Sequence, residues 1–301
     1  MPTLLEAIEA GPVVLDGGLG THLEARGNSV ASALWSAKIL RDDPDEVRAA
    51  HRDFFESGAR IATTCSYQVS YEGFASESRD EVNALLRRSV QLAGLARADA
   101  GLSPDEAWVA ASVGPYGSSP GCGTEYDGDY GLSVAELRAW HRPRIDALAE
   151  AGADVLLFET VPLLDEVEAI CAEMAGTGVS SMISVTVDSA GLRAGRSLEE
   201  FAALAEGVDE ISAIGVNCSA LPDADAALRA LAGASAKPLL VYPNTGEVWN
   251  PETRSWSGSA ERIDDYVDAW LSRGVALIGG CCRVTTTDIA RLAERVAAAA
   301  R

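Results

Sequence analysis

Short apolar runs alternate along the whole chain with longer segments in which apolar residues recur every three to four positions. The short runs have the length and composition of buried strands, and the longer segments have the period of amphipathic helices. The eight strand candidates are PVVLDG, RIATTC, WVAASVGP, VLLFET, SMISVTV, SAIGVNC, PLLVYPN and ALIGGCC. This alternation is typical of repeated βα units, which build a parallel sheet.

Residues that start and stop helices lie where this alternation requires them. Gly58, Gly152 and Gly274 each precede a strand candidate and occupy the position just past a predicted helix end, where glycine is favoured. A cap followed by proline, or a capping box, marks several helix starts. These starts are Asp43-Pro44, Ser133 with Glu136, and Ser197 with Glu200.

Eight alternations without a linker or low-complexity break predict an α/β protein with one domain, a (β/α)8 TIM barrel over residues 1–301. A doubly wound sheet is the alternative. The longest predicted loop, residues 115–133, follows the third strand and is rich in glycine, serine and tyrosine. In a barrel this loop lies over the C-terminal ends of the strands, where active sites form.

Composition narrows the classes of partner. The formal charge of −21 disfavours nucleic acid and anionic lipid, because an acidic surface repels phosphates. No apolar run reaches the roughly 18 residues of a membrane span, and the first residues lack a basic segment followed by an apolar one. We therefore expect a soluble, cytoplasmic protein. In that reducing compartment the six cysteines are not expected to form a disulfide framework, and clustered ones are better considered as metal ligands or nucleophiles.

Chemically reactive side chains stand at the C-terminal ends of most strand candidates. They are Asp16, Cys65, Glu159, Asn217, Cys218, Asn244, Cys281 and Cys282. In a parallel barrel all of these strand ends meet at one rim. Their convergence predicts a functional site there.

Cys218, Cys281 and Cys282 suit a zinc ion, which binds thiolates in tetrahedral geometry. Adjacent residues of a regular strand point to opposite faces, so both members of the vicinal pair can bind one metal only if the strand has already ended. Gly279 and Gly280 give the backbone the freedom to do so. Three protein ligands leave a fourth position open, as in catalytic zinc sites.

The cysteine spacing also permits simpler interpretations. Free cysteine is often buried in a core, and a redox dithiol is conceivable although the C-x-x-C spacing is missing. Spacing alone leaves zinc binding and these alternatives open. For Cys65, Cys122 and Cys171 the structural interpretation is preferred. Surface or satisfied structural roles are expected for the three histidines, which are His22, His51 and His141.

The segment LDGGLGTHLEARG superficially suggests a dinucleotide fingerprint, but the fit fails. Leu23 stands where the third glycine should be, and Asp16 would repel a pyrophosphate. Asp16 is better interpreted as a carboxylate at the rim, with Glu159 as a second. As a pair they are candidates for general acid–base work or for holding an ammonium group.

Many consecutive motifs match one family in the right order. They are LDGGLGTHLEARG, LWSAKIL, SYQVSYEGF, SVGPYG, EYDGDY, HRPRIDALAEAGADVLLFET, GVNCSAL, VYPNTGE and IGGCCR. On these motifs, which span nearly the whole chain, the sequence resembles the homocysteine S-methyltransferases, specifically the bacterial and plant enzymes that use S-methylmethionine as methyl donor.

The resemblance implies a (β/α)8 barrel with catalytic zinc bound by the three cysteines. It also implies that Asp16 and Glu159 bind the ammonium group of homocysteine and that Trp35 and Tyr67 lie near the methyl donor. A cationic sulfonium is attracted to aromatic faces and to an acidic pocket. Asn217, next to the first cysteine ligand, is a further candidate for substrate binding.

The implied reaction begins when the homocysteine thiol binds zinc and loses its proton. The sulfur then attacks the sulfonium methyl group, and with S-methylmethionine both substrates become methionine. S-adenosylmethionine is an alternative sulfonium donor, and glycine betaine serves a more distant branch of the family. Two other classes stay open at this point: a non-enzymatic zinc or thiol sensor on a barrel scaffold, and a hydrolase that uses Asp16 and Glu159 as an acid–base pair.

Overall fold

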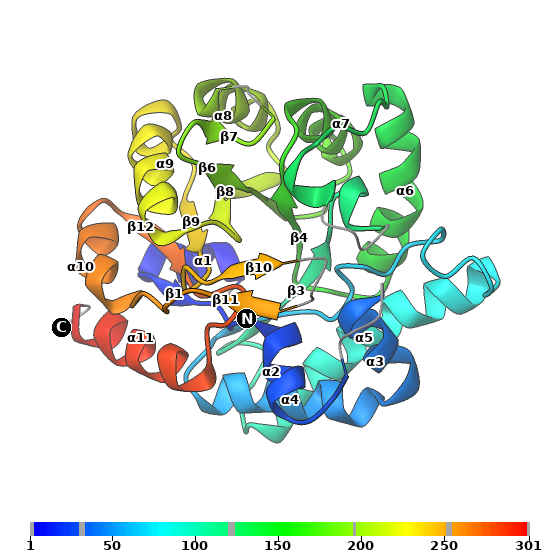
Figure 1. The fold of residues 1–301 in the computed structure, drawn as a ribbon, viewed down its shortest axis with the longest axis horizontal. Coiled ribbons are helices and arrows are strands. Elements are labelled where there is room, and N and C mark those ends of the chain that lie inside the picture. The colour runs from blue at the N-terminus through cyan, green and yellow to red at the C-terminus, as the bar shows by residue number, and fades with distance from the viewer. Residues whose placement is uncertain (1–2, 30–33, 120–123, 195–196, 251–254, 300–301) are drawn as a thin grey trace.

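In the computed structural model, parallel strands form a barrel inside a ring of helices (Figure 1). The structure describes residues 3–29, 34–119, 124–194, 197–250 and 255–299. The barrel strands in chain order are β1 (Val13–Val14), β2 (Ile61–Thr63), β3 (Trp108–Val113), β4 (Val155–Val161), β5 (Ser181–Val185), β8 (Ile211–Asn217), β9 (Leu239–Tyr242) and β12 (Val275–Ile278). Each of these strands overlaps one of the predicted apolar runs, in the predicted order.

The barrel closes where the two strands at the ends of the hydrogen-bonded ladder meet. The ladder runs β1-β12-β9-β8-β5-β4-β3-β2, which leaves β1 and β2 at its two ends. A parallel bridge between Leu15 and Ile61 joins them, with Asp16 N donating to Ile61 O at 3.0 Å and Arg60 N donating to Val14 O at 2.7 Å. The (β/α)8 prediction is confirmed, and the doubly wound alternative, which needs an open sheet, is wrong.

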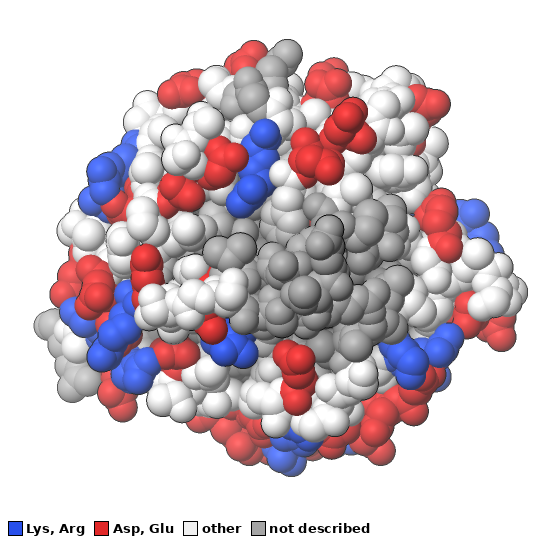
Figure 2. All heavy atoms as spheres, viewed as in Figure 1, with Lys and Arg blue, Asp and Glu red and all other residues white. Residues whose placement is uncertain are grey.

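Helices follow the barrel strands and pack around them. In chain order they are α2 (Leu19–Ala25), α3 (Trp35–Asp42), α4 (Pro44–Glu56), α5 (Arg79–Asp99), α6 (Val134–Glu150), α7 (Leu164–Met174), α8 (Leu198–Glu206), α9 (Leu221–Ala234), α10 (Asp264–Ser272) and α11 (Thr286–Ala299). Helix α1 (Leu4–Ala10) precedes β1. In the view of Figure 2, which is the same as that of Figure 1, acidic side chains are spread around the edge of the molecule and are interspersed with basic ones.

Several loops carry short elements of their own. Hairpin β6–β7 (Val187–Asp188 and Gly191–Leu192) connects β5 to α8, and hairpin β10–β11 (Val248–Asn250 and Ser255–Ser257) lies between β9 and α10. The long loop after β3 contains the 3-10 turns η1 (Tyr116–Ser118) and η2 (Thr124–Tyr126). These insertions follow the C-terminal ends of the strands, so they lie on the side where a barrel enzyme binds its substrates.

The helix boundaries agree with the sequence signals in most cases. Gly58, Gly152 and Gly274 follow the ends of α4, α6 and α10 with φ of 105°, 78° and 78°, a left-handed conformation that favours glycine. Both predicted capping boxes are formed, by Ser133 with Glu136 and by Ser197 with Glu200. Asp43 does precede α4, but its side chain makes no capping hydrogen bond, and Pro44 alone marks the start.

Apolar side chains fill the barrel interior and the layer between strands and helices. Interior residues such as Leu157, Met182 and Leu277 form one cluster, and a second, larger cluster joins the outer strand faces to the helices. Burial on both faces explains why the strands appear in the sequence as continuous apolar runs and not as alternating ones. Among the described helices, none combines the length and the hydropathy that crossing a lipid bilayer requires.

Candidate active site

Three cysteine sulfurs meet at the mouth of the barrel, by which we mean the C-terminal ends of the barrel strands. The Sγ atoms of Cys218, Cys281 and Cys282 all lie within 4.8 Å of one another, and those of Cys218 and Cys282 are 4.0 Å apart. Cys218 is buried, whereas the vicinal pair is partly exposed. The structure thus brings together the three residues that the sequence predicted as metal ligands.

The backbone around these cysteines has left regular strand geometry. Cys218 follows β8 with φ of 49°, an uncommon value for a residue other than glycine. Beyond the end of β12, Cys281 N donates to Pro243 O at 2.8 Å and Cys282 N donates to Asn244 Oδ1 at 3.0 Å. The loop after β9 therefore fixes the vicinal pair, and both side chains reach the same cluster because the strand has ended.

The two glycines before the vicinal pair are required by close packing. A Cβ atom on Gly279 would lie 2.6 Å from Leu15 Cβ and 2.9 Å from Asp16 O, and one on Gly280 would lie 2.2 Å from Val284 Cγ1. Real Cβ contacts are longer than this, so any larger residue would displace the turn. The sequence correctly located the end of the strand. Glycine is needed at both positions because there is no space for a Cβ atom, and not because the backbone adopts a positive φ.

The three thiols of the cluster have pKa values shifted in different directions. Hydrogen bonds from Cys281 and Cys282 hold the pKa of Cys218 well below its usual value, and the same contacts with Cys218 raise the pKa of both partners. A divalent cation is what would allow all three sulfurs to ionise together. A tetrahedral zinc ion with Zn–S bonds of about 2.3 Å separates its sulfur ligands by about 3.8 Å, close to the spacing here. The donor set therefore fits zinc.

Two buried carboxyl groups lie near the cysteine cluster. Asp16 is 2% exposed, and Glu159 is 7% exposed. Thr63 N donates to Asp16 Oδ2 at 2.8 Å, and Ser112 Oγ donates to Glu159 Oε1. No cation among the described residues forms an ion pair with either carboxyl group.

Burial sets the charge of these carboxyl groups. It raises the pKa of Asp16 to about 8, with the charge of Glu159 adding to the rise. It raises the pKa of Glu159 to about 7, with the charge of Cys218 adding to the rise. A cationic group placed between them would stabilise both carboxylates, so the pair is suited to an ammonium ion.

Glu159 is presented by a distorted end of β4. The next residue, Thr160, has φ of 62°, and the register with β5 shifts around this point. The side chain of Asn217 makes two hydrogen bonds with Thr160: its Oδ1 accepts from Thr160 N at 2.7 Å, and its Nδ2 donates to Thr160 Oγ1 at 2.8 Å. Its Oδ1 also accepts from Ser184 Oγ at 2.6 Å. The Asn217 side chain, predicted to bind substrate, is thus bonded within the barrel and holds the strained turn beside Glu159.

Of the two predicted aromatic residues, the structure describes the side chain of one. Tyr67 is half-buried, and its hydroxyl makes a hydrogen bond with Thr160. Burial raises its pKa well above the usual value, and the charges of Glu125, Cys218 and Glu159 add to the rise. Tyr67 therefore lies within the site. Trp35 begins helix α3, but its side chain lies outside the described residues.

Tyr126 is a site residue that the sequence analysis did not single out. It lies in turn η2, and its hydroxyl oxygen is 3.1 Å from Cys218 Sγ. Burial and the charge of Cys218 raise its pKa well above the usual value, so the phenol stays protonated. The sequence signals were the richness in tyrosine of a loop expected to cover the mouth and the motif EYDGDY, which contains Tyr126.

Two of the remaining cysteines, Cys65 and Cys171, do not join the cluster. Cys65 is buried, with Sγ donating to Ser36 O at 3.4 Å, and Cys171 is buried on α7. Burial raises the pKa of both thiols to about 12, which keeps them protonated. These observations agree with the structural roles predicted for them. Cys122 lies outside the described residues.

The three histidines lie away from the cluster and have different surroundings. His22 Nε2 is 2.9 Å from Asp53 Oδ2, and buried His141 Nε2 is 2.8 Å from Glu166 Oε1. His51 is fully buried and neither ring nitrogen has a hydrogen-bond partner among the described residues, so the expectation of a surface or satisfied side chain is wrong there. Burial lowers its pKa to about 4, which keeps the ring neutral.

Comparison with known proteins assigns the fold and the site to one family. The sequence model of the family described as homocysteine S-methyltransferase matches residues 13–296. The chain belongs to the homocysteine S-methyltransferase family. It is 43% identical over 294 residues to the homocysteine S-methyltransferase of Escherichia coli (strain K12), with 94% of each chain covered. It is 36% identical over 309 residues to the selenocysteine Se-methyltransferase of Brassica oleracea var. italica, covering 95% of this chain and 89% of that one.

Solved structures of a family member share the architecture. The metallated form of homocysteine methyltransferase MmuM from Escherichia coli superimposes with a TM-score of 0.84 at 40% identity, covering 95% of this chain and 96% of that one. The apo form of the same enzyme gives a TM-score of 0.76 at 37% identity and the same coverage. The resemblance found in the motifs is confirmed. This homocysteine S-methyltransferase family member is an enzyme that transfers a methyl group to homocysteine, which disfavours the sensor and hydrolase alternatives.

Proposed function

We propose that the methyl donor is a sulfonium compound, S-methylmethionine, and that Cys218, Cys281 and Cys282 hold a catalytic zinc ion. One observation carries the proposal: three sulfurs within 4.8 Å of one another lie beside two buried carboxyl groups that have no cationic partner among the described residues. A thiol-bearing amino acid is the substrate that needs both features together.

The cysteines supply three of the four ligands that zinc prefers. When bound there, zinc lowers the pKa of a thiol at the remaining position, so that the thiol is ionised at neutral pH. Tyr126 covers Cys218 from the loop after β3 and limits the access of water to this side of the cluster.

Asp16 and Glu159 orient homocysteine by binding its ammonium group. Both carboxyl groups are held in place from inside the barrel, by Thr63 N and by Ser112 Oγ. Because the bound ammonium stabilises their charged forms, substrate binding lowers both pKa values and releases any protons they carried. Fixing the ammonium there directs the short side chain of homocysteine toward the cysteine sulfurs.

The reaction is a single methyl transfer between sulfur atoms. The homocysteine sulfur, having lost its proton to solvent, attacks the methyl carbon, and a carbon–sulfur bond forms. The bond between that carbon and the donor sulfonium breaks, and its electron pair stays on the donor sulfur. S-methylmethionine and homocysteine then yield two methionine molecules and one proton. The ring of Tyr67 and the acidic mouth attract the sulfonium cation before transfer.

The test combines metal analysis of the purified protein with methionine formation from homocysteine and each of S-methylmethionine, S-adenosylmethionine and betaine. We expect about one zinc ion per chain and the highest kcat/KM with S-methylmethionine. A clear preference for S-adenosylmethionine or betaine would contradict the proposed donor. Full turnover by protein that contains no metal would contradict the proposed role of the cysteines.

A further inference from the structure

Among the described residues, an arginine at the mouth of the barrel forms no ion pair with a carboxylate. Arg193 follows hairpin β6–β7 and is half-buried. Its Nε donates to Thr186 Oγ1 at 3.2 Å, and its guanidinium carbon lies 5.3 Å from the ring centroid of Tyr126. The hydrogen bond and the stacking hold the guanidinium in place before any ligand binds.

Two separate contacts connect this guanidinium to the cysteine cluster. Thr186 Oγ1, which accepts from Arg193, itself donates to the carbonyl oxygen of Cys218 at 3.3 Å. Tyr126, which stacks against Arg193, places its hydroxyl 3.1 Å from Cys218 Sγ. Arg193 is therefore separated from Cys218 Sγ by little more than the tyrosine ring.

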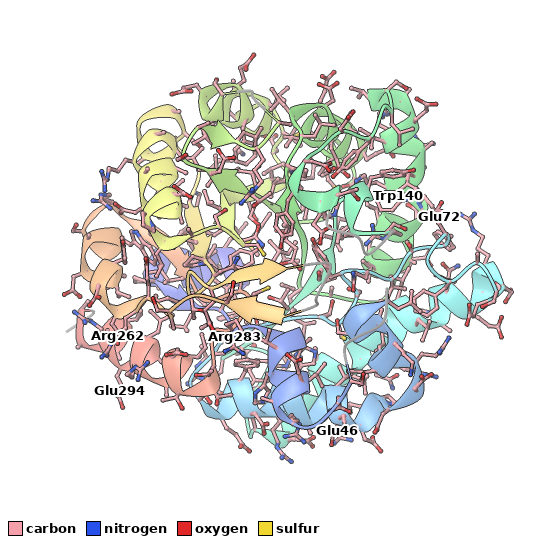
Figure 3. The ribbon with its side chains drawn as sticks, viewed as in Figure 1. Glu46, Glu72, Trp140, Arg262, Arg283 and Glu294 are labelled. Atoms are coloured by element: carbon pink, nitrogen blue, oxygen red, sulfur yellow. The ribbon has the colours of Figure 1, made fainter. Side chains whose placement is uncertain are left out.

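A second arginine near the cluster has a different environment. Arg283, labelled in Figure 3, donates from Nε and Nη2 to the two carboxylate oxygens of Glu247 at 3.1 and 3.0 Å. That bidentate pair neutralises its charge and uses Nε and one terminal nitrogen as donors. Arg193 forms no ion pair with a carboxylate in the part of the chain that the structure describes. Burial and the charge of Asp188 raise the pKa of nearby Asp223, and the charge of Arg193 only opposes that rise. Among the described contacts, Asp223 and Arg193 make no hydrogen bond.

The substrates create a need for a cation at this place. An amino-acid donor with a sulfonium group also carries a carboxylate, and the acidic residues and thiolates that attract the sulfonium repel that carboxylate. Homocysteine lies deep, with its ammonium at buried Asp16 and Glu159 and its sulfur among the cysteines. The donor must approach from the outer side, where Arg193 lies.

We propose that Arg193 binds the carboxylate of the methyl donor and so selects donors that are amino acids. The inference rests on the proposed function, because it takes a sulfonium amino acid as the donor. A guanidinium held at Nε still offers its terminal nitrogens to a carboxylate, and such charge-assisted hydrogen bonds are among the stronger ones in proteins.

The test compares two donors that differ only in this carboxylate: S-methylmethionine and its methyl ester. For Arg193→Gln we expect kcat/KM with S-methylmethionine to fall about 10- to 100-fold, the range for a lost charge-assisted contact. The KM for homocysteine should stay unchanged. The wild-type enzyme should disfavour the ester by a similar factor, and Arg193→Gln should cause no further loss with the ester. Arg193→Lys, which keeps the charge but not the planar fork, should restore part of the activity with S-methylmethionine.

Arg88→Gln is the matched control, because it removes the same charge from an exposed position on α5, a helix of the outer ring. It should match the wild type with both donors. Equal losses with S-methylmethionine and its ester, or a raised KM for homocysteine in Arg193→Gln, would overturn the inference while leaving the proposed function intact. No wild-type turnover with S-methylmethionine would overturn the proposed donor and this inference together.

Discussion

The two ends of the barrel are built from the same strands but carry opposite chemistry. At the N-terminal end, helix α1 places Leu4 and Ile8 in a buried apolar cluster with Val13 and Trp108. At the mouth, the segment that begins as β1 with Val13 ends in Asp16, a buried carboxyl group. One end contributes hydrophobic burial, and the other end contains groups that are costly to bury.

Backbone conformation differs between the ends in the same way. The positive φ values found at described residues other than glycine belong to Thr160, Cys218 and Arg283, all at or just past the ends of barrel strands at the mouth. Such conformations persist only where the surrounding structure imposes them, and they cluster at functional sites. The comparison suggests that burial elsewhere in the barrel supports a strained, chemically demanding mouth.

The largest expected effect on activity comes from removing one sulfur at the mouth. Cys281→Ala should lose the metal and lower kcat/KM by about 1,000-fold or more, because two thiolates bind zinc far less tightly than three. Its circular dichroism spectrum should match the wild type. Cys171→Ala, which removes a buried thiol on α7, should keep both metal and turnover. A metal-free Cys281→Ala protein with normal turnover would remove the distinction between the two ends.

A second substitution at the mouth should have opposite effects on activity and stability. Asp16→Asn should lower kcat/KM for homocysteine by about 100-fold, because the substrate ammonium loses a buried charged partner. The asparagine keeps an oxygen that can accept from Thr63 N, so the fold should survive. Steady-state kinetics with homocysteine varied at saturating donor measures the effect, and an unchanged kcat/KM would contradict the role of Asp16.

The difference in stability between the wild type and this same variant should depend on pH. Because the pKa of Asp16 rises from 3.8 to about 8 on folding, the stability that its protonated form contributes is complete below about pH 4 and is lost as pH rises to about 8. Asp16→Asn lacks this loss. In denaturant titrations of substrate-free protein, the variant should therefore gain stability relative to wild type between pH 5 and pH 8. A constant difference across this range would show that burial does not raise this pKa.

At the opposite end we expect a loss of stability with little effect on activity. Ile8→Ala should lower the free energy of unfolding by about 2 to 4 kcal/mol, because it leaves a cavity in the apolar cluster. Its kcat/KM should stay within about twofold of the wild type, since Ile8 lies on helix α1 at the N-terminal end of the barrel. Leu5→Ala is the control on the same helix, because Leu5 is 40% exposed, and it should change stability by less than about 0.5 kcal/mol. A large fall in kcat/KM for Ile8→Ala at a temperature where it is folded would indicate that the ends are coupled.

The barrel and the cysteine cluster were predictable because they depend on repeating local signals. Apolar runs gave the strands, glycines such as Gly152 gave the helix ends, and a parallel barrel necessarily gathers its strand ends, which places Cys218 beside the vicinal pair. No part of that argument requires knowledge of how loops pack.

The contributions of Tyr126, Arg193 and Asn217 depend on tertiary contacts that no local pattern encodes. Tyr126 meets Cys218 across 92 positions of sequence, and Arg193 meets Tyr126 only because a hairpin folds back beside β8. Asn217 was expected to face substrate because it adjoins Cys218, yet its amide is bonded to Thr160 and Ser184. Sequence position identified the rim, and packing decided which side chains face its interior.

The central claim is that three cysteines hold zinc beside a position reserved for the homocysteine thiol. Zinc-edge X-ray absorption of the zinc-loaded enzyme, recorded with and without homocysteine, tests it most directly. The account predicts three sulfur ligands and one lighter ligand without substrate, and four sulfur ligands after homocysteine is added. A coordination shell that stays the same when homocysteine is added would contradict it.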